Sequence, residues 1–196
     1  MTEATGARMS AAETATHYLI NPGVSRFTAR VFASGMLSSF GHNPTIAIRE
    51  YTGEAVISSA NLQQASLRIS IPAGSLEVAD DISQKDRAEI ESRMQQDVLE
   101  TSSYPVIVFE SSQATSNPLS ENLHAVQVIG NLTLHGVTRA ERITAQVTLI
   151  GDTLRASGDF SIQQTNYGIK LVSVAAGTLK VKDEVKIAFD FSARKQ

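Results

Sequence analysis

The sequence contains no cysteine and no tryptophan. The absence of cysteine excludes disulfides, thiolate catalysis, zinc–thiolate sites and cysteine-linked lipid anchors. Charge is also scarce: charged residues make up 19% of the 196 positions, and 17 basic against 20 acidic side chains leave a net charge of −3. A near-neutral chain lacks the basic surface by which proteins bind nucleic acids. We therefore expect no nucleic-acid partner.

The chain also lacks a continuous apolar run of the roughly 20 residues that cross a membrane as a helix, so we expect no stable membrane insertion. Residues 1–16 are small, polar and mildly acidic, without the basic start and apolar stretch of a secretory signal. We interpret residues 1–16 as a disordered tail and residues 17–196 as one domain, which the length allows. On this basis we expect a cytoplasmic protein.

Apolar residues make up 42% of the chain, and most of them recur at every second position. In the segment 65–71, for example, Ala65, Leu67 and Ile69 alternate with polar residues. Alternation over four to eight residues is typical of half-buried strands with one apolar face. About eight such segments, separated by short turns, predict an all-β protein, either an antiparallel sandwich or a barrel.

One segment shows the helical period instead. Ile90, Met94 and Val98 recur every four residues among charged neighbours, and Ser83 precedes Asp86 by the spacing of a helix cap. We predict one short amphipathic helix at about 84–99, packed on the sheet or across a barrel end. The polar stretch 111–122 is expected to be a loop.

The apolar faces of the predicted strands are almost entirely aliphatic or phenylalanine. Eight strands can close into a barrel whose interior is filled by its own side chains or holds one small ligand. A cavity lined in this way would be dry, and an apolar chain is its natural occupant; a filled core is the alternative. The alternation places twelve residues on the inner face: Phe27, Val31, Leu67, Ile69, Ile107, Phe109, Leu132, Leu134, Phe160, Ile162, Ile187 and Phe189.

The sharpest local motif runs from Gly130 to Thr138, with the sequence GNLTLHGVT. It predicts a strand that enters a tight turn, where Gly136 can adopt a positive φ without steric cost. His135 is then a turn residue, either exposed or bonded to the backbone. The four histidines show no metal-ligand spacing, and no phosphate-binding glycine loop or nucleophile elbow occurs. We expect no metal and no cofactor.

Together with its surroundings, this motif resembles the YceI-like family of lipid- or polyisoprenoid-binding proteins. The resemblance covers about 18–193 and includes the segments 18–22, 104–111, 158–162 and 167–169. It implies an eight-stranded antiparallel barrel of the lipocalin type. In its lumen it would hold a long-chain amphiphile, such as a polyisoprenoid, an isoprenoid quinone or a fatty-acid derivative. It also implies a tendency to form a homodimer. We expect no enzymatic role.

The chain departs from the pattern of this family at three positions. Asn21 stands where an aspartate is usual, and Gln164 and Asn166 occupy positions that often carry a basic residue and an aspartate. If those charges seat a polar headgroup, the ligand preferred by this chain differs. Our candidates for headgroup contacts at the barrel mouth are His42, Asn43 and Tyr167; for His42, turn stabilisation is the alternative.

We therefore predict that the protein sequesters or carries a long apolar chain. One alternative is a protein-interaction or assembly module whose barrel is only a scaffold, which predicts a filled core and an apolar outer patch. The other is an enzyme acting on a bound lipid. That function requires ionisable groups that converge in the cavity.

Overall fold

The structure is a computed structural model that describes residues 15–35, 43–58, 61–174 and 179–196. The predicted disordered tail falls outside these residues, except that residues 15 and 16 belong to the first strand. Within the described ranges, twelve strands form one sheet. Their bounds are β1 (Ala15–Ile20), β2 (Arg26–Gly35), β3 (Thr45–Ile48), β4 (Thr52–Ser58), β5 (Asn61–Pro72), β6 (Leu76–Val78), β7 (Val106–Pro118), β8 (Leu123–Leu134), β9 (Val137–Ile150), β10 (Thr153–Gln163), β11 (Ser173–Val174) and β12 (Leu179–Lys195).

Eight of these strands close into an antiparallel barrel, which confirms the predicted fold. The order is β1-β4-β5-β7-β8-β9-β10-β12, and β12 pairs back onto β1. The closing register pairs Tyr18 with Lys195 and Ile20 with Ala193. Closure satisfies the backbone hydrogen bonds that two open edges would leave exposed.

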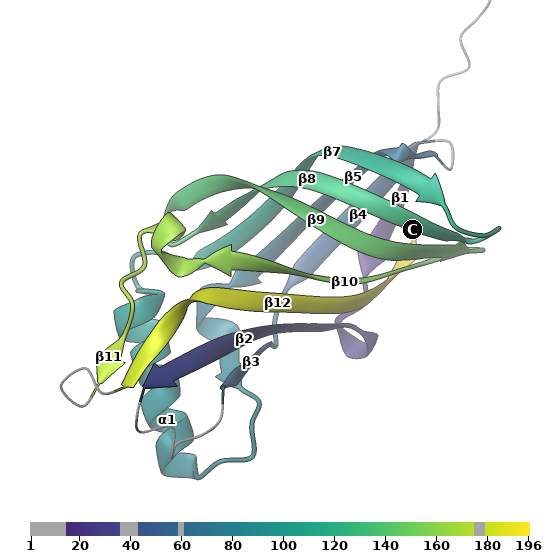
Figure 1. The fold of residues 1–196 in the computed structure, drawn as a ribbon. Helices are drawn as coiled ribbons and strands as arrows, with labels where there is room; N and C mark the ends of the chain where they lie inside the picture. The colour runs from purple at the N-terminus through teal and green to yellow at the C-terminus, as the bar shows by residue number, and fades with distance from the viewer. Residues whose placement is uncertain (1–14, 36–42, 59–60, 175–178) are drawn as a thin grey trace, which may run out of the picture.

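The last strand is 17 residues long, and along the side away from β10 it pairs with two strands in succession. Its C-terminal end pairs with β1, whereas residues 179–190 pair with β2. From β2 the sheet continues through β3 to β6, which is its last strand on that side. The strands β2, β3 and β6 thus form a three-stranded branch of the barrel wall, which lies beside α1 in Figure 1.

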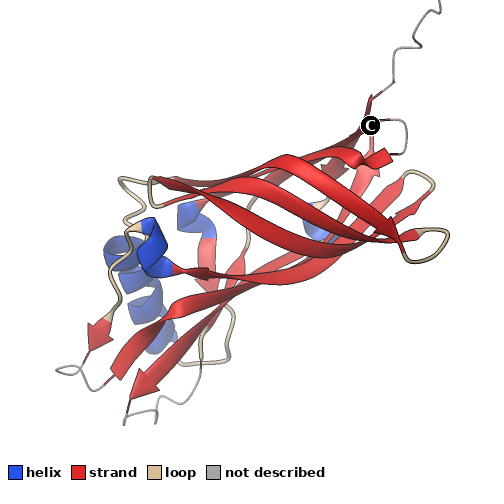
Figure 2. Cartoon of the chain, turned by 45° about the horizontal axis from the view of Figure 1, so that its top comes forward, coloured by secondary structure: helices blue, strands red, loops and turns tan. Residues whose placement is uncertain are grey.

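Most of the helical segments gather at one end of the barrel (Figure 2), which we call the helical end. It contains α1 (Gln84–Arg93), the π-helical turn η4 (Met94–Val98) and the short 3-10 helix η5 (Gln164–Tyr167). The Ser83 hydroxyl accepts the Asp86 N–H at 3.1 Å, as the sequence predicted for the helix start. The predicted helix is therefore confirmed in place, but its last turn is the wider π form.

The prediction of a loop at 111–122 is wrong, because β7 continues to Pro118 and leaves only residues 119–122 as a turn. The strand pairs with β8 almost residue by residue, with Ala114 opposite Val128 and Ser116 opposite Val126. Ala114 is buried, while the polar neighbours face outward. Pairing with β8 thus outweighs the weak local strand signal of this polar segment.

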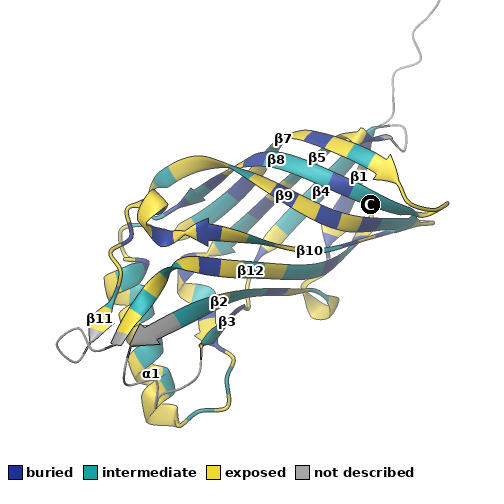
Figure 3. Cartoon of the chain, viewed as in Figure 1, coloured by how far each residue is buried: buried dark blue, intermediate teal, exposed yellow. Residues whose placement is uncertain are grey.

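Burial alternates along the strands, as the banding of β9 and β10 in Figure 3 shows. On β9, Ile143, Ala145 and Val147 are buried, while Thr144 and Gln146 are exposed. The inner face is thus the apolar face that the alternation predicted.

Two glycines on the inner face make room for phenylalanine rings. A Cβ at Gly130 would lie 2.4 Å from Phe109 Cζ and 2.7 Å from the Glu110 carbonyl oxygen. A Cβ at Gly158 would lie 2.5 Å from the Thr144 carbonyl oxygen and 2.9 Å from Phe189 Cζ. Because the backbone oxygens cannot move away cheaply, both positions require glycine. The glycine that opens the GNLTLHGVT motif therefore seats the ring of Phe109.

Replacing Gly130 with alanine should destabilise the barrel by about 1–3 kcal/mol, because the new methyl group clashes with a ring and a carbonyl. Urea unfolding measures this change. Gly74→Ala is the matched control, since a Cβ at Gly74 would have no atom within 4 Å. Equal stability of the two variants would contradict the steric account.

Candidate ligand-binding cavity

The barrel encloses a cavity of about 260 Å³. Its lining follows β5 from Leu62 to Ile71 and β10 from Leu154 to Ile162. Nine residue steps along a strand amount to roughly 30 Å, so the lining runs through most of the barrel length. An apolar cavity of about 150 Å³ already holds benzene. The lumen is therefore hollow rather than filled by its own side chains.

The lining is almost wholly apolar. Among the described residues that form it, three carry a polar side-chain group, namely Ser66, Ser111 and Gln164, and none carries a charge. The Ser111 hydroxyl accepts the Leu67 N–H at 2.7 Å, at the bulge in β7. Such a wall offers an apolar molecule a dry surface and few polar contacts.

The structure brings all twelve predicted inner-face residues together on this lining. Because each of them points into the barrel, any area that stays exposed faces the lumen. Contact between these side chains and a ligand stays a prediction. Six of the twelve are buried, namely Phe27, Ile69, Phe109, Leu132, Leu134 and Ile162, and six are half-buried, namely Val31, Leu67, Ile107, Phe160, Ile187 and Phe189.

Sequence reasoning missed the part of the lining that comes from outside the strands. Met94 and Val98 of η4, together with Leu99, contribute to the wall at the helical end. Their spacing of four residues was visible as the apolar stripe of the helix. The surface that this stripe would face depends on tertiary packing, which the stripe itself does not specify.

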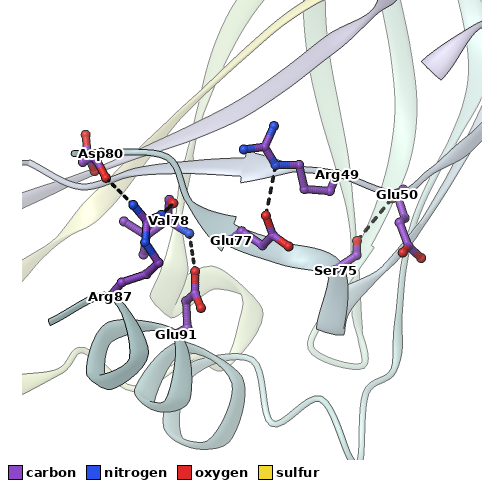
Figure 4. Close-up of polar contacts among 8 residues, drawn as sticks. All are labelled: Arg49, Glu50, Ser75, Glu77, Val78, Asp80, Arg87 and Glu91. Atoms are coloured by element: carbon purple, nitrogen blue, oxygen red, sulfur yellow. Dashed lines mark hydrogen bonds and ion pairs between the residues drawn. The ribbon is translucent and has the colours of Figure 1, made fainter. Parts of the chain in front are cut away.

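Polar contacts fasten α1 to the edge of the sheet (Figure 4). The N–H of Val78 in β6 donates to Glu91 Oε1 at 2.9 Å. Arg87 donates to the carbonyl oxygens of Val78 and Asp80, the latter at 2.8 Å. These side chains complete hydrogen bonds that an edge strand would otherwise make with water.

Apolar burial contributes less to this attachment, because no residue of α1 is fully buried. Ile90 is half-buried and packs against the core cluster of the helical end. The polar side chains of α1 therefore carry a large share of its docking onto β6.

Removing the Glu91 carboxylate should loosen this attachment, because it leaves the Val78 N–H without its acceptor. We expect Glu91→Ala to weaken local stability by about 1–3 kcal/mol and to accelerate amide hydrogen exchange at Val78 and in α1. Glu89→Ala is the control, since Glu89 is exposed and pairs with Arg93 of the same helix. Equal exchange rates in the two variants would contradict a docking role for Glu91.

Of the three predicted headgroup residues, Tyr167 does not lie at a mouth of the cavity. Tyr167 is 0% exposed and lies outside the cavity lining, with its hydroxyl donating to Glu141 Oε1 at 2.5 Å. Asn43 is exposed, just before β3, and His42 falls outside the described residues. Tyr167 therefore supports the wall from behind, and its assignment to the mouth is corrected.

His135 ties the turn of the GNLTLHGVT motif to η5. Its Nδ1 donates to the Tyr167 carbonyl oxygen at 3.2 Å, and its ring lies 4.4 Å from that of Tyr104. Both His135 and Gly136 adopt positive φ angles, of 51° and 72°. The backbone-bonded turn histidine expected from the sequence is thus present.

Burial, with the hydrogen bond and negative charge of Glu141 in addition, raises the pKa of Tyr167 above its ordinary value. The stability contributed by the protonated hydroxyl is therefore complete below about pH 10 and declines as the pH rises toward the folded-state pKa. Tyr167→Phe lacks this pH-dependent contribution. We expect the variant to be about 1 kcal/mol less stable near neutral pH.

Above about pH 10, the free energy of unfolding of the wild type should fall more steeply than that of Tyr167→Phe, by up to about 1.4 kcal/mol per pH unit. The gap in the free energy of unfolding therefore narrows, as chemical unfolding at several pH values would show. A constant gap between pH 7 and pH 11 would count against a titrating Tyr167 hydroxyl.

Among the described residues, no group of three acidic or histidine side chains is arranged to hold a metal ion. No helix among them is long and apolar enough to cross a membrane.

Comparison with known proteins settles the family. The family model of the YceI-like domain matches residues 18–193. The chain belongs to the YceI-like family. No match was found among curated proteins.

Solved structures share the YceI-like fold at low sequence identity. BcnA from Burkholderia cenocepacia is 18% identical with a TM-score of 0.67, and the match covers 88% of this chain and 98% of BcnA. A polyisoprenoid binding domain from Saccharophagus degradans is 17% identical with a TM-score of 0.65, over 91% and 98%. A Campylobacter jejuni YCEI protein is 14% identical with a TM-score of 0.58, over 77% and 84%. These likenesses show a common fold.

Proposed function

We propose that this protein binds a long-chain amphiphile in its barrel lumen, and thereby sequesters or carries it. The candidate ligands are a polyisoprenoid, an isoprenoid quinone or a fatty-acid derivative. The observation that carries the proposal is the continuous apolar cavity along the strands. Family membership supports it, as does the shared fold of the polyisoprenoid binding domain from S. degradans.

The energetics of such a cavity favour a chain over a compact polar molecule. Each buried methylene group contributes roughly 0.8 kcal/mol. A chain of a dozen carbons would therefore bind with few polar contacts. By contrast, acid–base chemistry on a bound lipid needs ionisable groups in the cavity, and the described lining residues supply none.

Native mass spectrometry tests the proposal on the protein as purified. We expect an adduct that is lost after organic extraction, because a dry apolar lumen retains its occupant through aqueous purification. Lipid analysis of the extract would then identify the chain. Protein that is free of ligand from every expression host, and that takes up no added long-chain probe, would overturn the proposal.

A lumen-filling variant tests the location of the site. Ala65 lines the cavity, whereas Ala188 on β12 is exposed. Ala65→Phe should lower the affinity for an apolar fluorophore by tenfold or more (about 1.4 kcal/mol), since the ring occupies the space of the chain. Ala188→Phe makes the same chemical change outside and should leave the affinity unaltered.

Circular dichroism would verify that both variants fold, and Val128→Phe offers a second filling position on β8. Equal affinity of folded inner and outer variants would place the bound molecule outside the barrel.

A further inference from the structure

We propose that the ligand enters and leaves the lumen sideways, through a seam in the barrel wall between β5 and β7. The seam lies between residues 62–66 of β5 and residues 111–114 of β7. The inference rests on the proposed function and goes beyond it, because it assigns the route by which the ligand is exchanged.

The hydrogen-bonded ladder between these two strands stops well before the strands end. β5 has 12 residues and β7 has 13, yet within the described ranges their register contains five pairs, the last of which is Arg68 with Glu110. By comparison, β7 pairs with β8 over residues 108–118, across one bulge. A molecule that passes beyond Arg68 and Glu110 therefore parts two strands without breaking a ladder between them.

The same stretch of β5 is also loosened on its other side. Val56 of β4 pairs with Ser66 and Ser58 pairs with Asn61, so residues 62–65 form a bulge. In the described registers, these four residues have a ladder partner on neither neighbouring strand. This part of the wall can therefore shift outward while the ladders above and below it stay intact.

Side-chain contacts close the seam in place of a ladder. The Ser111 hydroxyl accepts the Leu67 N–H at 2.7 Å. Where the ladder ends, Arg68 Nη1 and Glu110 Oε1 form an exposed ion pair at 2.8 Å, and such pairs contribute little stability in water. Leu62 is buried among the core residues of the barrel and holds the bulge from within. These few contacts can open and form again without unfolding the barrel.

The cavity meets the protein surface at this seam. Among the described residues that line the cavity, Ser66 is the one that is exposed, whereas the others are buried or half-buried. Ala65 and Leu67 point into the lumen, so Ser66 lies on the outer side of the same strand. An outward residue lines the cavity where the wall is open between strands. Ser66 therefore marks the opening.

The helical end is closed more firmly. There α1 is fastened to β6 by the hydrogen bond from the Val78 N–H to Glu91 and by that from Arg87 to the Asp80 carbonyl oxygen. Exit along the barrel axis would displace a helix together with these hydrogen bonds. Exit through the seam displaces one bulge.

Bridging the seam tests the inference on the full-length protein. The chain contains no cysteine, so Gln64→Cys combined with Gln113→Cys supplies the two thiols that a short bismaleimide can join after folding. Both glutamines are exposed and lie outside the cavity lining, on β5 and β7 respectively. Stopped-flow fluorescence then follows the binding of N-phenyl-1-naphthylamine and its displacement by excess dodecanol.

We expect the bridge to slow association and dissociation by the same factor, about tenfold or more, and to leave the Kd unaltered. The reason is that a barrier on the route changes both rates alike, whereas a change in the binding site changes their ratio. The same variant capped with N-ethylmaleimide should exchange ligand as fast as the wild type.

A second bridge controls for general stiffening of the barrel. Gln146→Cys combined with Ser157→Cys places thiols on the outer side of β9 and β10, at residues that are paired in an intact ladder. This bridge should leave both rates unaltered.

The outcomes separate the route from the proposed function. Equal rates in the bridged and the N-ethylmaleimide-capped proteins would contradict the inference, as would equal slowing by the two bridges. If Glu91→Ala, which loosens α1, speeds exchange while the seam bridge has no effect, the route lies at the helical end and the inference is wrong. Binding of neither N-phenyl-1-naphthylamine nor dodecanol by the wild type would contradict the proposed function itself.

Discussion

The closure of eight strands around an apolar inner face is the constraint on which the rest of the structure depends. In an eight-stranded barrel the interior is just wide enough for side chains to fill. Here, however, the inner wall includes alanines such as Ala55, Ala65 and Ala156. The rings of Phe109 and Phe189 pack over the inward-facing Gly130 and Gly158, where a side chain would otherwise lie. Since the side chains fall short of the axis, closure leaves a hollow.

The inner face could be predicted because it depends on a local rule. Successive side chains in a strand point to opposite sides, so the alternation around Leu67 and Ile187 marks the lining without knowledge of strand order. The twelve predicted residues therefore all lie on the cavity wall. The turn at His135 and Gly136 could be predicted for a similar reason, because the positive φ angle that it requires is a local property of the sequence.

Features that depend on distant partners could not be predicted in this way. The polar end of β7 is a strand because β8 pairs with it. One side of β12 pairs with both β1 and β2, because β1 reaches only its last residues. Tyr167 lies behind the wall through a hydrogen bond to Glu141 on another strand. Gln164 lies in η5 and donates to the Lys182 carbonyl oxygen in the irregular stretch of β12, a contact that no periodicity reveals. The polar parts of the site are thus the parts that tertiary contacts decide.

The central claim is that a long apolar chain occupies the lumen, and methyl NMR spectroscopy during a titration with dodecanol tests it most directly. The account predicts shifts in the signals of lumen methyl groups such as Leu67, Ile107 and Ile187. Signals of the exposed residues Leu19, Val24 and Ile150 should stay in place. Shifts confined to the exposed residues, or no shifts at saturating dodecanol, would contradict the account.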